Sequence, residues 1–200
     1  MTADRPATSF DGDRQSFLGN LGYGTWAAPE ALNNDELDLW KMSNGYALLT
    51  KEGLLNINAQ LSMHNDRERE ALKENLKVGI QWNTEVTLNQ SKQIVSQVYC
   101  SALPVSYTAI ESVYFENFAR LILEATYEAT LYASLINLEK NKCPKLYLTI
   151  IGGGAFGNKM AWIIESMSSA IKKFKNTPLE VGIVSYGGSK QEVREMISAF

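Results

Sequence analysis

The sequence predicts an α/β protein with a largely parallel sheet, and two observations carry this prediction. From residue 93 onward, strand and helix patterns alternate as β-α-β-α-β-α, and the strand at 145–151 is a nearly continuous apolar run. Alternating strands and helices are typical of parallel pairing with right-handed crossovers. A continuous apolar strand is typical of a sheet that is covered on both faces. Ligands of such sheets bind at the carboxyl ends of the strands.

Each element of the second half has its own pattern. Strands are predicted where apolar and β-branched residues alternate or run together: 77–87, 93–105, 145–151 and 179–187. Helices are predicted where apolar residues recur every three or four positions: 115–140, 159–174 and 189–200. Pro104 is expected to end the second strand. Ser189 as N-cap with Glu192 three residues later predicts a capping box for the last helix.

The first half is less regular. Residues 1–34 are rich in Gly, Asn, Asp and Pro and are expected to form an irregular N-terminal segment with a glycine-rich loop. Residues 36–62 predict two short helices, or a helix and a turn, and 66–76 predict a charged helix. The expected organisation is therefore the irregular segment 1–34 followed by one α/β domain over 35–200.

Composition excludes several classes of protein. The chain has 200 residues, 45% of them hydrophobic and 20% charged, as in a globular protein with a sizeable core. A net charge of −3 without a basic stripe argues against nucleic-acid binding. No apolar run of spanning length and no signal peptide is visible, so we expect a cytoplasmic protein without a membrane partner. The single histidine, His64, nearly excludes a His-based triad or metal site.

The sharpest motif lies between the strand at 145–151 and the helix at 159–174. Gly152, Gly153, Gly154, Ala155, Phe156 and Gly157 formally satisfy G-x-G-x-x-G. Backbone N–H groups beside a helix N-terminus can cradle a phosphate, and missing Cβ atoms let the anion approach closely. The alternative is a tight turn without a ligand. A dinucleotide-binding enzyme would place an acidic residue at the end of the next strand, where this chain has "IVSYGGS".

Four segments resemble one known family. "YGTWAAPEAL", "DLWKMSNGYALLT", "QVYCSALPVSY" and "GGGAFGN" look like segments of the macrodomain ADP-ribosylhydrolases of the MavL type, which include a Legionella effector and related eukaryotic proteins. The resemblance covers roughly residues 20–190. It implies a macrodomain-like three-layer α/β/α fold with a mixed, largely parallel sheet. It also implies ADP-ribose as ligand or product, no required cofactor, and an ADP-ribosylated protein as partner.

The chain departs from the family at its beginning. Macrodomains usually begin with a strand that ends in an Asn-Ala-Asn-like turn and carry an early Asp that binds adenine, and neither is recognisable here. Either this subfamily has diverged, or the chain is the C-terminal part of a longer macrodomain. A secreted bacterial effector of this kind would act in the host cytosol.

The resemblance implies roles for the residues of the glycine motif. The N–H groups of residues 153–157 would hold the diphosphate, with Gly152 opening the loop, and Phe156 would pack against a ribose or shield the cleft. Asn158 would cap the following helix or bind a ligand hydroxyl. Tyr186 would stack on adenine, or would be a half-buried tyrosine at the sheet edge.

Hydrolysis of an ADP-ribose bond needs a carboxylate near the distal ribose. Asp35 and Asp38, which precede Trp40, are the candidates, although each could also be a surface charge. No metal constellation is evident. Four functions stay open at this point: an ADP-ribosylhydrolase, a non-catalytic ADP-ribose reader, an NAD-dependent oxidoreductase, and an interaction domain whose glycines only make a turn.

Overall fold

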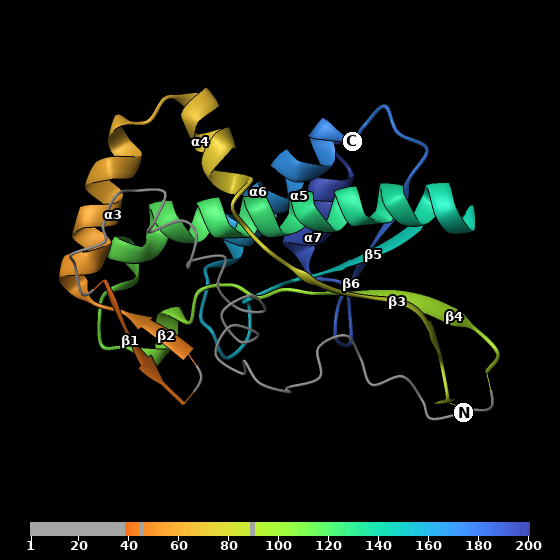
Figure 1. The fold of residues 1–200 in the computed structure, drawn as a ribbon, viewed down its shortest axis with the longest axis horizontal. Coiled ribbons are helices and arrows are strands. Elements are labelled where there is room, and N and C mark those ends of the chain that lie inside the picture. Colours follow the sequence, from red (N-terminus) through yellow and green to blue (C-terminus); the bar gives the residue numbers. More distant parts are fainter. Residues whose placement is uncertain (1–38, 45, 89–90) are drawn as a thin grey trace.

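The computed structural model describes residues 39–44, 46–88 and 91–200 as a mixed α/β structure (Figure 1). The predicted order from residue 93, β-α-β-α-β-α, is confirmed by β4, α5, β5, α6, β6 and α7. None of the described helices has the length and apolarity needed to cross a bilayer.

The elements, in chain order, are β1 (Trp40–Ser43), β2 (Tyr46–Leu49), α3 (Lys51–Met63), α4 (Asp66–Lys73), β3 (Gly79–Glu85), β4 (Ile94–Tyr99), the 3-10 turns η2 (Val105–Tyr107) and η3 (Ser112–Phe115), α5 (Glu116–Asn141), β5 (Lys145–Thr149), α6 (Met160–Lys173), β6 (Glu180–Val184) and α7 (Gln191–Ile197).

The described strands form three separate two-stranded sheets. β1 pairs with β2 and β3 pairs with β4, both antiparallel. β5 pairs with β6 in parallel, in register from Lys145 opposite Glu180 to Thr149 opposite Val184. Within the described part of the chain, parallel pairing is thus restricted to the two strands on either side of α6.

The expectation that the strand at 145–151 is buried on both faces is wrong. Leu148 of β5 is 2% exposed, whereas its neighbour Tyr147 is 66% exposed. Side chains alternate between the faces of a strand, so one face of β5 packs into the core and the other faces outward. An apolar run alone cannot tell a strand buried on one face from a strand buried on both, because a tyrosine counts as apolar whichever face it lies on.

The region 36–62 also differs from its prediction. A β-hairpin, formed by β1 and β2, stands where the first short helix was expected, and only α3 is helical. Asn44 has a positive φ of 49°, and Asn-Gly is the strongest sequence signal for a tight hairpin turn. That pair signals a turn between strands rather than a break in a helix. α3 then begins after Thr50, whose side chain accepts a hydrogen bond from the Gly53 N–H at 2.9 Å.

Two boundaries are corrected as well. The strand predicted to end at Pro104 ends at Tyr99. The predicted capping box of the last helix is wrong, because the N-cap is Lys190 and no side chain caps this end. The Ser189 carbonyl instead accepts a hydrogen bond from the guanidinium of Arg194.

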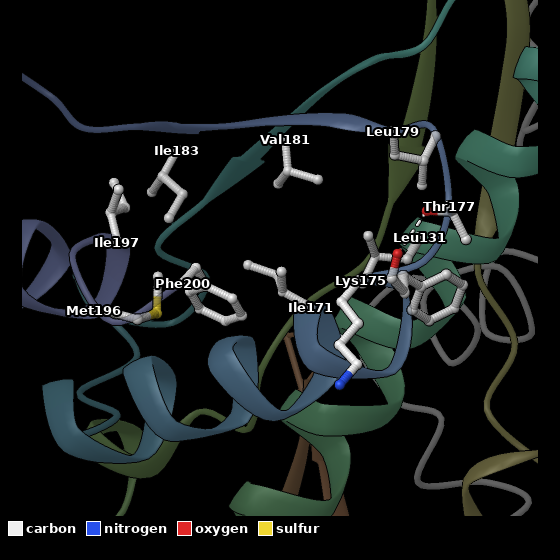
Figure 2. A pocket seen from close by; sticks show the side chains of 11 residues that line it. Leu131, Ile171, Lys175, Thr177, Leu179, Val181, Ile183, Met196, Ile197 and Phe200 are labelled. Carbon is white, nitrogen blue, oxygen red and sulfur yellow. Dashed lines mark hydrogen bonds between the residues drawn. The ribbon is translucent and has the colours of Figure 1, made fainter.

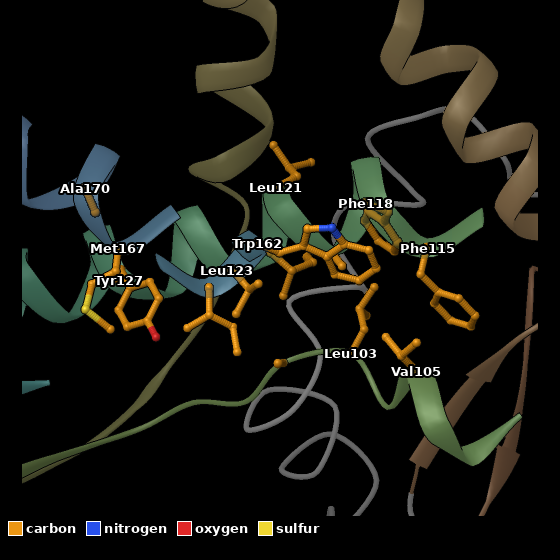
Figure 3. Close-up of a cluster of buried hydrophobic side chains, with 14 of the residues drawn as sticks. Leu103, Val105, Phe115, Phe118, Leu121, Leu123, Tyr127, Trp162, Met167 and Ala170 are labelled. Atoms are coloured by element: carbon orange, nitrogen blue, oxygen red, sulfur yellow. The ribbon is translucent and has the colours of Figure 1, made fainter. Parts of the chain in front are cut away.

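The hydrophobic core extends from β2 and α3 to α6, and many of its large side chains lie where α5 packs against α6 (Figure 3). Trp162 of α6 is 1% exposed and lies among Leu103, Leu121 and Phe118, and Tyr127 lies beside Met167 in the same layer. Large buried aromatic side chains contribute most to such a core because each removes a large apolar area from water. The long helix α5 is therefore the element against which the others pack.

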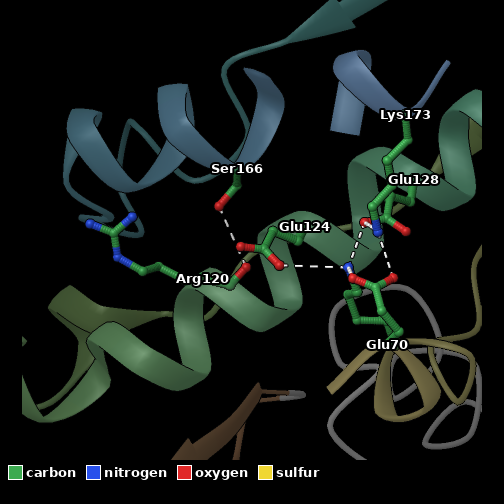
Figure 4. Close-up of polar contacts among 7 residues, drawn as sticks. Glu70, Arg120, Glu124, Glu128, Ser166 and Lys173 are labelled. Carbon is green, nitrogen blue, oxygen red and sulfur yellow. Dashed lines mark hydrogen bonds and ion pairs between the residues drawn. The ribbon is translucent and has the colours of Figure 1, made fainter. Parts of the chain in front are cut away.

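Five charged groups join α4, α5 and α6 (Figure 4). The Lys73 ammonium of α4 has only 6% of its side chain exposed and lies 2.6 Å from carboxylate oxygens of both Glu70 and Glu128. Lys173 of α6 lies 2.8 Å from the same Glu128 oxygen. A third carboxylate, Glu124, is 3.6 Å from Lys73. Burial, together with the negative charges of Glu128 and Glu70, raises the pKa of Glu124 even though Lys73 opposes the shift.

These contacts predict opposite effects for two glutamates of α5. A carboxyl group whose pKa is raised by folding destabilises the folded state increasingly as the pH rises above its unfolded pKa, and the cost is complete above the folded pKa. Glu124→Gln is therefore expected to gain up to about 1 kcal/mol of stability at pH 7. The gain should become small near pH 4, where Glu124 is mostly protonated in both the folded and the unfolded protein. Glu128→Gln removes the partner of two ammonium groups and is expected to lose roughly 3 kcal/mol. Urea unfolding at pH 7 and pH 4 measures both.

The two variants control for each other, because each replaces one carboxylate of α5 with an amide one turn apart. A Glu124→Gln protein that is less stable than the unmodified protein at pH 7 would contradict the sign of the Glu124 shift. It would mean that the Lys73 attraction outweighs burial.

Candidate functional site

The glycine loop, defined here as residues 152–158, connects the carboxyl end of β5 to α6. Tyr127 of α5 fixes the point at which the chain leaves β5. Its buried hydroxyl donates a hydrogen bond to the Thr149 carbonyl at 2.9 Å and accepts one from the Ile151 N–H at 3.3 Å. The loop after β6 leaves from the same edge of this parallel pair, which is the edge where ligands of α/β proteins bind.

Three of the four glycines have a steric reason within the fold. Gly152 has a φ of +76°, and a Cβ there would lie 2.4 Å from the Cβ of Ala102. Gly157 has a φ of +71°, and its Cβ would lie 1.7 Å from the Ser106 hydroxyl oxygen. A Cβ on Gly153 would meet Ile150 at 2.9 Å. Residues 152 and 157 must be glycine because segment 102–106 passes against the loop.

Gly154 is different. It is exposed, its φ is not positive, and a Cβ built on it would meet no atom within 4 Å. Neither backbone conformation nor packing against the described protein requires glycine at this position. What a glycine provides here is unobstructed access to the backbone from outside.

The hydrogen bonds of the loop leave its middle amides free. The N–H groups of Gly153, Gly157 and Asn158 donate to the carbonyls of Ile150, Gly154 and Gly152 at 3.4, 3.0 and 3.0 Å. Two of the five amides expected to face a diphosphate, those of 153 and 157, are thus bonded within the protein. In the described structure, the amides of 154–156 have no hydrogen-bond acceptor. Three consecutive N–H groups therefore have no partner within the described structure.

Phe156 belongs to a cluster of three rings, which we call the aromatic triad. Its ring lies 5.8 Å from Tyr46 of β2 and 5.3 Å from Tyr107 of η2, and the two tyrosine rings are 5.1 Å apart. All three contacts are edge-to-face, the favourable geometry for aromatic pairs. The Ser106 N–H also donates to the Phe156 carbonyl at 3.0 Å. The triad holds the middle of the loop against two segments that are distant in sequence.

Asn158 anchors the loop from behind and does not cap α6. It is 5% exposed, and its side-chain nitrogen donates to the carbonyls of Leu103 at 2.8 Å and Gly152 at 3.4 Å. The capping role expected for it is wrong, because the N-cap of α6 is Lys159. Its side-chain oxygen is buried and has no hydrogen-bond partner in the described structure.

The N-terminus of α6 favours an anion. No side chain caps it and its first turn has no acidic residue, whereas Thr50 and Asn65 cap α3 and α4 through their side chains. The N-cap residue is Lys159, whose ammonium lies 5.1 Å from the centre of the Trp162 ring. The first N–H groups of a helix carry partial positive charge. The uncapped helix end therefore contributes partial positive charge next to the loop, and its N-cap residue is a lysine.

The other predicted residues fall in different places. Tyr186 follows β6 and is fully exposed, so the alternative of a half-buried tyrosine at the sheet edge is wrong. Asp35, Asp38 and the irregular segment 1–34 lie outside the described residues. Tyr46 and Tyr107 were not recognised as site residues, because their contact with Phe156 joins three segments and leaves no local pattern in the sequence.

The described residues give little support for a metal site or for a cysteine nucleophile. No group of three or more His, Cys, Asp or Glu side chains there could hold a metal ion. Cys100 and Cys143 are free thiols. Burial raises the pKa of Cys100 to about 11, so its thiol is not activated as a nucleophile.

Comparison of the chain with known protein families, curated proteins and solved structures finds no match. The resemblance to macrodomains therefore stays a prediction, and the geometry of the loop is the evidence that bears on function.

The steric roles of the glycines predict a double-variant cycle. Gly157→Ala is expected to cost about 3 kcal/mol of stability, from the positive φ and from overpacking against Ser106. Ser106→Gly in the same chain removes the clash, so the pair should couple favourably by about 1–2 kcal/mol. Chemical denaturation of the two single variants and the double variant measures this coupling.

Gly154→Ala is the matched control, because the same methyl group enters open space. Its stability should stay within about 1 kcal/mol of the unmodified protein. Equal losses for Gly154→Ala and Gly157→Ala would refute the distinction between the two positions.

Proposed function

We propose that this chain binds ADP-ribose in a macrodomain-like fold and removes it from a modified protein. The single observation that supports this most is the row of free amides at 154–156, beside a glycine that the described packing does not require. A diphosphate presents several oxygen acceptors in a short span, which suits three consecutive donors at a helix N-terminus.

The surroundings of the loop favour a nucleotide sugar over a bare anion. The aromatic triad adjoins the free amides, and Phe156 supplies both an amide and a ring. Tyr107 is 41% exposed, so part of the triad is open to a ligand. A sugar attached to the diphosphate would find an apolar ring face and tyrosine hydroxyls there. Tyr186, exposed at the adjacent strand end, is the candidate for stacking on adenine.

In this proposal, hydrolysis depends on residues before β1. The residues found to bond to or stack on the loop include Leu103, Ser106, Tyr46 and Tyr107, none of which has a carboxylate. Asp35 and Asp38 are therefore the proposed source of the carboxylate that activates water. The same observation favours the second candidate function, a reader that holds ADP-ribose without cleaving it.

Binding is tested by calorimetry with ADP-ribose. Gly154→Glu places a negative, bulky side chain beside the free amides and is expected to weaken ADP-ribose binding at least about tenfold. Ser169→Glu adds the same charge at an exposed position of α6 and should leave affinity unchanged. Because Gly154 has room for a side chain, thermal unfolding should show that both variants fold.

Titration with NAD separates the remaining alternatives. Tighter binding of NAD than of ADP-ribose would favour the oxidoreductase. If neither ligand binds the unmodified protein, the nucleotide proposal fails. The remaining alternative is then an interaction domain whose glycines only make a turn.

Catalysis is tested by incubating the protein with an ADP-ribosylated substrate protein and measuring released ADP-ribose. Loss of the activating carboxylate typically costs about a hundredfold or more, so Asp35→Ala or Asp38→Ala should lower the rate by that order. Asp66→Ala, at an exposed acid in the first turn of α4, is the control and should keep full activity. Binding without release in the unmodified protein would establish the reader.

A further inference from the structure

A second candidate site lies between β6, α6 and α7, away from the glycine loop. It is a cavity of about 200 Å³. Figure 2 shows Val181 and Ile183 reaching from β6 toward Ile171 of α6, with Phe200 between these two layers. Met196 and Ile197 of α7 lie at one end of the cavity and Leu131 lies at the other, and Phe174 also lines it. No residue of the glycine loop or of the aromatic triad lines this cavity.

The cavity is lined mainly by apolar side chains. Its one hydroxyl, on Thr177, already donates a hydrogen bond to the Phe174 carbonyl at 2.6 Å. Apolar walls recognise alkyl or aromatic groups by removing their surface from water. These side chains therefore favour a ligand with a hydrocarbon part.

Two lysines supply charge beside the cavity. The aliphatic stem of Lys175 lines the cavity, and the ammonium lies at the end of the side chain away from β6 (Figure 2). The Lys172 ammonium lies 6.0 Å from the centre of the Phe200 ring. Neither ammonium forms an ion pair in the described structure, in contrast to Lys173 next to them in the sequence, which binds Glu70 and Glu128. These positive groups are complementary to an anionic head group.

We propose that this cavity binds a medium-chain carboxylate, with its alkyl chain inside the cavity and its carboxylate at Lys172 and Lys175. Long cationic side chains commonly keep the stem on apolar surface and the charge in water, where it can meet an anion. A cavity of about 150 Å³ holds benzene, so about 200 Å³ fits a chain of about eight carbons. This proposal is independent of ADP-ribose binding.

Chain length provides the first test. In calorimetric titrations with butanoate, hexanoate and octanoate, Kd should fall about fourfold for each added methylene. The gain should stop at about eight carbons, so dodecanoate should bind no more tightly than octanoate. Octanol, which has the same chain without the charge, should bind more weakly than octanoate.

Variants locate the site. Lys172→Gln together with Lys175→Gln should weaken octanoate about fivefold and leave octanol unchanged. Lys145→Gln, on the exposed Lys145 of β5, is the matched control and should have no effect. Val181→Phe fills the cavity and should abolish binding of both ligands. The lysine variants are at the surface, so they keep the test valid if the phenylalanine variant fails to fold.

Three results would overturn the proposal. The absence of saturable octanoate binding at millimolar concentration would make the cavity a packing defect. Octanol could bind as tightly as octanoate, which would exclude recognition of the carboxylate. Octanoate affinity unchanged in a folded Val181→Phe protein would place the ligand elsewhere.

Discussion

The packing of α6 against α5 is the interface on which the rest of the described structure depends. Trp162 and Met167 from α6 are buried together with Phe118 and Tyr127 from α5. Both ends of the glycine loop are fixed through this interface, since Tyr127 holds the end of β5 and α6 begins just after Asn158. Close-packed helices move little relative to each other, so the free amides of the loop are held in place before any ligand arrives.

The G-x-G-x-x-G pattern combines two unrelated causes. Gly152 and Gly157 are glycine because segment 102–106 passes within contact distance and because their φ angles are positive. Gly154 meets neither condition. A sequence motif cannot separate these causes, because the segment that imposes the steric constraint lies about fifty residues earlier in the chain. Only the folded structure assigns a separate reason to each glycine.

The sequence was sufficient to predict secondary structure where one hydrophobic periodicity extended over many residues. α5, α6, β5 and β6 were predicted close to their observed bounds, because a long amphipathic or apolar pattern outweighs local noise. The hairpin of β1 and β2 was missed because each strand has only four residues. The outward face of β5 and the aromatic triad were missed because they depend on which elements meet in space. Asp35 and Asp38 lie beyond the described residues, so that part of the site stays a prediction.

The open space around Gly154 has a consequence for how this protein can diverge. Descendants that change residue 152 or 157 would lose stability, whereas descendants that acquire a side chain at 154 would keep their stability and alter only what the loop accepts. Substitutions at residue 154 should therefore reflect selection on ligand binding, whereas the glycines at 152 and 157 reflect selection on stability.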